Sequence, residues 1–132
     1  MTDLSRSPEH IRAVMARYAV LMQTADADAI ATLFAEDAVL EDPVGTPAHV
    51  GRDAIRTFFK TGFDATGGGM NFVWDGPVRV ADVWGAAAAT VKLEKAPDPF
   101  EVETLDVMEF RPDGLVASLK AYHGPTGTRP LR

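Results

Sequence analysis

Three side chains that could carry acid–base chemistry lie on apolar faces of the elements that the sequence predicts. Asp106 lies in the middle of the apolar face of a strand expected over residues 100–111, and Asp42 shares a face with Leu40. Tyr18 lies in the apolar stripe of a predicted helix. If the three converge in an apolar pocket, a carboxylate could remove a proton next to a carbonyl group, while the other two groups donate hydrogen bonds to the developing oxyanion.

Each of these side chains also has a purely structural interpretation. A buried tyrosine commonly bonds a backbone carbonyl, and an aspartate before Pro43 can belong to a turn or a cap. A shift of one residue in strand register would turn Asp106 to the solvent. No Lys or Arg shares the predicted face of Asp106, so we expect burial to raise the pKa of its carboxyl.

The elements that must position these residues come in two groups. Ser7 and Pro8 are a typical start for the first helix, and apolar residues then recur at helical spacing. We expect further helices over about 26–35 and 52–62, a short strand over 38–42, and strands over about 70–81, 84–95, 100–111 and 114–122. Helices followed by strands predict an α+β domain, with a curved antiparallel sheet and helices packed on one face.

The composition limits the classes of function. The 132 residues suit one domain over 1–132, with loose tails at about 1–7 and 125–132. A net charge of -6, with the 13 Lys and Arg unclustered, argues against binding to nucleic acid or to an anionic membrane. The chain has no cysteine, which excludes disulfides and thiolate chemistry. The N-terminus has no apolar run of a signal peptide, and a cytoplasmic protein is expected.

Metal chemistry is not expected either. The three histidines, His10, His49 and His123, share neither a helix face nor strand spacing, which argues against a transition-metal site.

Several stretches resemble one enzyme family over about residues 8–124. They are "PEHIRAVMARY", "LFAEDAVLEDPVG", "GRDAIRTFF", "TLDVMEF" and "GLVASLKAYHG". They are similar to the bacterial Δ5-3-ketosteroid isomerases, which belong to the superfamily of proteins that resemble nuclear transport factor 2 (NTF2-like). The resemblance implies a cone-shaped fold, with three N-terminal helices on a strongly curved antiparallel sheet. It also implies catalysis without a cofactor and a homodimer that forms through the outer face of the sheet.

The same resemblance implies a role for each of the three polar residues. Asp42 matches the general acid/base that moves a proton from C4 to C6 of a 3-oxo-Δ5-steroid through a dienolate. Tyr18 and Asp106 match the two oxyanion-hole donors, of which the aspartic acid stays protonated. The chain departs from the family at two places. Phe58 and Phe59 stand where members can carry supporting tyrosines. His123 stands near a bulky aromatic position, where it could either pack against the steroid or hydrogen-bond to Asp42 and lower its basicity.

The substrate pocket is expected to be apolar, with room for a flat ligand. The run "GAAAAT" over 85–90 keeps one strand small, which is compatible with an interior hollow. The expected lining residues are Val20, Leu21, Val44, Phe58, Phe59, Met70, Phe72, Trp84, Met108 and His123.

Two other functions remain open on the sequence alone. A polyketide cyclase similar to SnoaL would use one acid/base aspartate on an enolisable polyketide. A non-catalytic steroid- or lipid-binding protein would need the pocket but not the carboxyls. An epoxide hydrolase of this fold is less favoured, because no Arg lies between two Asp residues on a pocket face.

Overall fold

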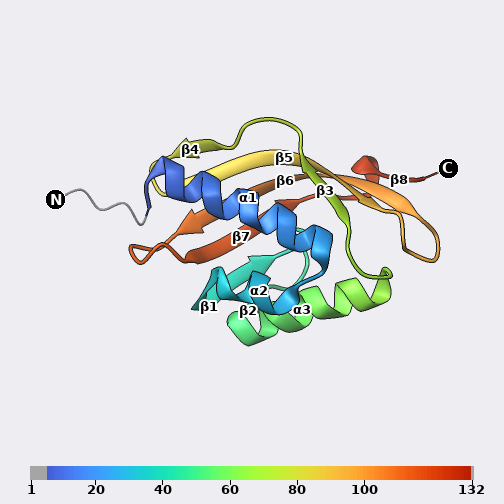
Figure 1. Cartoon of the computed structure of the whole chain (residues 1–132), viewed down its shortest axis with the longest axis horizontal. Helices are drawn as coiled ribbons and strands as arrows, with labels where there is room; N and C mark the ends of the chain where they lie inside the picture. The colour runs from blue at the N-terminus through green and yellow to red at the C-terminus, as the bar shows by residue number, and fades with distance from the viewer. Residues whose placement is uncertain (1–5, 132) are drawn as a thin grey trace.

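The computed structural model describes residues 6–131, which contain three α-helices, with two strands between the second and the third (Figure 1). The helices are α1 (Pro8–Thr24), α2 (Ala27–Thr32) and α3 (Arg52–Ala65). Ser7 caps α1 by accepting a hydrogen bond from the backbone N–H of His10 at 3.1 Å, as the sequence predicts. Asp26 caps α2 in the same way through the N–H of Ala29. The predicted tails lie partly outside the described residues, namely over 1–5 and 132.

The strands form one sheet in the order β2-β1-β7-β6-β5-β3, with β4 paired to β5 and β8 paired to β6. Their bounds are β1 Phe34–Glu41, β2 His49–Val50, β3 Asn71–Trp74, β4 Arg79–Ala81, β5 Trp84–Leu93, β6 Phe100–Phe110, β7 Val116–Tyr122 and β8 Thr128–Pro130. A short 3-10 helix, η1 (Pro125–Gly127), precedes β8. The α+β fold with three helices on a curved sheet is confirmed.

The structure corrects three details of the expected sheet. The sheet is mixed, because β1 pairs with β7 in parallel. The strand expected over 70–81 is divided into β3 and β4, both of which pair with β5. The strand expected over 38–42 starts earlier, at Phe34, and ends at Glu41, so Asp42 is the first residue after β1.

The helices cover one face of the sheet. Figure 1 shows α1 lying across the strands, while α3 lies along the side of β1 and β2. A Cβ atom at Gly85 would come within 2.5 Å of Ile11 and 2.7 Å of Met15, so α1 packs directly on the start of β5. The small residues of "GAAAAT" therefore let α1 approach the sheet, rather than leave a hollow there.

The central strand β6 has the two faces that the sequence predicts. Thr104, Asp106 and Met108 are buried on the side of the helices, whereas Leu105 on the opposite side is 43% exposed. This register places the Asp106 carboxyl in the interior, with 2% of its surface exposed. Within residues 6–131, no helix is long and apolar enough to span a membrane.

Candidate active site

A cavity of about 220 Å³ lies between the helices and the inner face of the sheet. Its wall is mostly apolar, and side chains from α1, α3, β3, β5 and β6 contribute to it. The polar side chains in the wall are Tyr18, Asp42, Thr104, Asp106 and His123. The structure therefore brings the three polar residues predicted from the sequence to one cavity, together with His123, which the sequence also predicts in the lining, and Thr104, which it does not.

Asp106 enters the cavity wall from β6 and is hydrogen-bonded to a neighbour on the same strand face. The hydroxyl of Thr104, two residues earlier, donates to Asp106 Oδ1 at 2.8 Å. Burial is the main reason that the pKa of Asp106 rises to about 7, and the negative charge of Asp42 raises it further. The Thr104 hydrogen bond and the charge of His123 act in the opposite direction. Below about pH 7 the Asp106 carboxyl is therefore protonated and can donate a hydrogen bond.

Tyr18 enters the cavity wall from the middle of α1 and is 1% exposed. The rings of Phe59 and Phe72 pack against its ring in edge-to-face contacts, with centroid distances of 6.0 and 5.5 Å. Burial, together with the negative charges of Asp106 and Asp42, raises the pKa of the phenol well above its usual value of 10.0. The phenol therefore keeps its proton at neutral pH and remains a hydrogen-bond donor.

Asp42 lies where β1 ends and is held beside the end of β7. The backbone N–H of Val44 donates to the carbonyl of Ala121 at 2.8 Å, which joins the turn after Asp42 to β7. His123, which follows β7, contacts Asp42 directly, with 2.7 Å between Nε2 and Oδ1. The hydrogen bond to Asp42 is the main reason that the pKa of His123 is raised above 6.5. The Asp42 side chain is 17% exposed and that of His123 is 24% exposed, so both reach the cavity and the solvent at its mouth.

The structure places only part of the predicted lining in the cavity wall. Phe58, Phe59, Met70, Phe72 and His123 are in the wall.

Five residues that the sequence predicts in the lining are not in the cavity wall, and this corrects the prediction: they are Val20, Leu21, Val44, Trp84 and Met108. Val20 and Trp84 point outward, with 49% and 43% of their surface exposed. Leu21 and Met108 are buried in the core, and Val44 lies in the turn after β1.

Sequence reasoning missed several residues of the wall. Thr104, Val102 and Phe100 share the face of Asp106 on β6, so the alternation of that strand could have indicated them. The others that were missed are Met22, Gly62, Phe63, Val91, Leu93 and Ala121. Among residues 6–131, no cluster of three His, Asp or Glu side chains could hold a metal ion.

Residues 12–119 match the SnoaL-like domain, and the chain belongs to this family.

One curated relative and one solved structure illustrate what the chain is similar to. The chain is 34% identical over 115 residues to a steroid Delta-isomerase of Nocardioides simplex. The matched region covers 87% of this chain and 90% of the relative. The solved structure of SalBIII, an epoxide hydrolase/cyclase-like enzyme in pyran ring formation in the polyether salinomycin, superposes with a TM-score of 0.84. It is 23% identical and the match covers 96% of this chain and 99% of that one, so the likeness shows a shared fold.

The raised pKa of Asp106 predicts that its ionisation weakens the folded state. The folded pKa of about 7 lies above the usual 3.8, so the folded chain holds one more proton than the unfolded chain between these values. This stabilisation is complete below about pH 4 and is lost as the pH rises through 7. The free energy of unfolding falls by about 4 kcal/mol over this range. We expect Asp106→Asn, whose amide oxygen can still accept from Thr104, to match the wild type near pH 4. At pH 8 it should be more stable by about 4 kcal/mol.

Urea unfolding at a series of pH values measures this difference. Asp98→Asn is a matched control, because Asp98 is exposed and its replacement should leave the pH dependence of the stability unchanged. Parallel stability curves for the wild type and Asp106→Asn would show that Asp106 has an ordinary pKa.

Proposed function

We propose that this protein is a cofactor-independent steroid Δ-isomerase, which converts 3-oxo-Δ5-steroids to 3-oxo-Δ4-steroids. One observation supports this most strongly. Two carboxyls and a phenol meet in the wall of an apolar cavity, where one carboxyl is bonded to a histidine and the other is protonated below about pH 7. The relationship to a steroid Delta-isomerase over 87% of the chain supports the same substrate class.

The proposed reaction divides the work between a base and two donors. Asp42 takes the proton from C4, and the electron pair of the C–H bond moves into the dienolate, whose charge collects on the C3 oxygen. Tyr18 and Asp106 donate hydrogen bonds to that oxygen, and the apolar wall keeps water away, which strengthens both bonds. Asp42 then returns the proton to C6, so the enzyme and the proton count are unchanged at the end.

The test of this proposal is a spectrophotometric assay of the wild-type protein. Adding a 3-oxo-Δ5-steroid should produce the rising absorbance of the conjugated enone. A protein that binds a phenolic steroid yet produces no enone would instead be a binding protein or an enzyme for another substrate. For an enzyme with another substrate, an enolisable polyketide is the next compound to test, because the SnoaL-like family and the acid/base position of Asp42 suit a cyclase as well.

His123 should restrain the proposed base. Its hydrogen bond to Asp42 Oδ1 stabilises the ionised carboxylate, and this bond weakens when Asp42 takes up a proton. His123→Phe keeps a ring of similar size but removes the hydrogen bond. We expect kcat at pH 6 to rise about tenfold, which corresponds to one hydrogen bond to a charged group. His10→Phe, on α1 and outside the cavity wall, is the control. A fall in kcat for His123→Phe would show instead that His123 assists the reaction.

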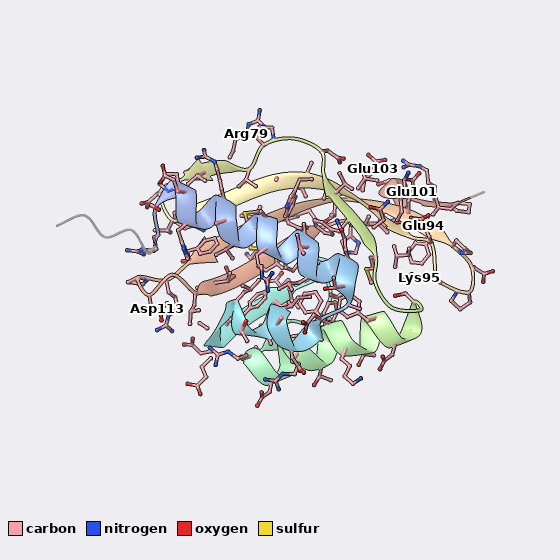
Figure 2. All side chains as sticks on the ribbon, viewed as in Figure 1. Arg79, Glu94, Lys95, Glu101, Glu103 and Asp113 are labelled. Atoms are coloured by element: carbon pink, nitrogen blue, oxygen red, sulfur yellow. The ribbon has the colours of Figure 1, made fainter. Side chains whose placement is uncertain are left out.

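We also propose that two copies associate through the outer face of the sheet, as the resemblance implies. Leu105 and Tyr122 are cross-strand neighbours on that face, with 43% and 46% of their surface exposed. Figure 2 shows Glu101 and Glu103 at one end of the sheet, and Arg129 of β8 forms ion pairs with both. Charged residues lie on both sides of this pair along the face, with Glu101 and Glu103 at one end and Lys120 and Glu109 toward the other, so Leu105 and Tyr122 form an apolar area between them. We expect Leu105→Glu to give a monomer in sedimentation, whereas an unchanged mass would exclude this interface.

A further inference from the structure

The hydrogen bond between Thr104 and Asp106 joins two buried side chains on the inner face of one strand. Thr104 is 8% exposed and Asp106 is 2% exposed, and both belong to the cavity wall. The Thr104 hydroxyl lies 2.8 Å from Asp106 Oδ1. Such a hydroxyl can donate to this oxygen whether the carboxyl is ionised or protonated, since the oxygen without the proton accepts in both cases.

We propose that Thr104 is a positioning residue for Asp106, because its hydroxyl occupies Oδ1 and directs the acid proton to Oδ2. The proton on Oδ2 is then the one that can be donated to the substrate oxygen. The proposal deepens the proposed function, and its catalytic part rests on that function. A valine at this position would keep the shape of the side chain but leave the acid proton free to occupy either oxygen.

The surroundings of Asp106 show why one hydroxyl can have a measurable effect. Its cross-strand neighbours are Ala87 on β5 and Ala121 on β7, which carry no charge. The titratable groups that act on its pKa come from other elements, namely Asp42 after β1 and His123 after β7. The charge of Asp106 in turn raises the pKa of the Tyr18 phenol on α1.

The Thr104 hydroxyl therefore contributes the hydrogen bond that favours the ionised form of Asp106, against the effect of burial. Its removal has two consequences. The carboxyl should hold its proton to a higher pH, and the proton should lose its fixed position.

The experiment compares the wild type with Thr104→Val and Thr104→Ser. The carboxyl titration of Asp106, followed by ¹³C NMR of aspartate-labelled protein, should move up by about one pH unit in Thr104→Val and stay in place in Thr104→Ser. Asp106→Asn identifies the signal. In the enone assay of Thr104→Val, the pH at which kcat falls on the alkaline side should rise by the same amount as the Asp106 titration. Below pH 6, kcat should be about three- to tenfold lower than in the wild type.

Coincident Asp106 titrations in the wild type and in Thr104→Val would overturn the proposal, whatever happens to the rate. If Thr104→Val does not fold, Thr104→Ala removes the same hydroxyl with a smaller side chain and tests the same shift. If the wild type has no isomerase activity, the proposed function fails, yet the carboxyl titration still decides the role of Thr104. A loss of rate that Thr104→Ser does not restore would show a role in packing only.

Discussion

Asp42→Asn should reduce kcat for isomerisation by about 10²- to 10⁴-fold, the usual contribution of a positioned general base. The amide fills the same space and can still accept a hydrogen bond from His123, but it cannot take the proton from C4. The steroid should continue to bind, because the rest of the cavity wall is unchanged. The loss should therefore appear in kcat, with little change in the Kd of a phenolic steroid.

The matched control for this variant is Glu36→Gln, the same change of a carboxylate to an amide on an exposed position of β1. It should have the activity of the wild type. Equal rates in the wild type and Asp42→Asn would remove Asp42 from the mechanism. They would also favour the reading of the cavity as a binding site without catalysis.

Tyr18→Phe should reduce kcat by about 10²- to 10³-fold, the typical cost of losing one oxyanion-hole donor. The phenol keeps its proton at neutral pH because burial and the nearby carboxyls raise its pKa, so it is ready to donate when charge develops on the substrate oxygen. The edge-to-face contacts of the ring with Phe59 and Phe72 need no hydroxyl, and the fold should tolerate the change.

The chain offers a control for this substitution as well. Tyr122→Phe removes the other tyrosine hydroxyl, which lies on the outer face of the sheet with the side chain 46% exposed. It should leave kcat unchanged in the enone assay. A loss of less than about threefold in Tyr18→Phe would mean that Asp106 alone holds the oxyanion.

The alternation of β6 explains why much of the site could be predicted from the sequence. Period-two patterning fixes which side chains share a face, and a carboxylate in the middle of an apolar face is hard to explain except as a buried group. The same reasoning placed Tyr18 in the interior through the helical stripe of α1. Burial of both residues is observed, at 2% and 1% exposure.

The failures have a common physical origin, because periodicity assigns a face but not a distance along it. Met108 shares the inner face of β6 with Asp106, yet it lies one step further along, in the packed core. The small residues of β5 were expected to leave room, but the space is filled by α1, which packs against Gly85. The parallel pairing of β1 with β7 could not be foreseen, since it depends on where distant segments meet.

The contact between His123 and Asp42 was foreseen only as one of two possibilities. The spacing of 81 residues between them gives no local signal, and the contact exists because β1 and β7 end side by side. Thr104 could have been found, since it lies two residues before Asp106 on the same face. On its own, its polar side chain fits a core face, and only the position of Asp106 two residues later indicates a partner for the carboxyl.

The most direct test of proton transfer by Asp42 follows one labelled atom. A 3-oxo-Δ5-steroid that carries deuterium at C4 is converted in ordinary water, and the position of the label in the product is read by NMR. Proton transfer by Asp42 predicts deuterium at C6 of the 3-oxo-Δ4-steroid with the wild type, and formation of that product about 10²- to 10⁴-fold more slowly with Asp42→Asn. Failure to form product, or a product whose new C6 hydrogen comes entirely from water, would contradict proton transfer by Asp42.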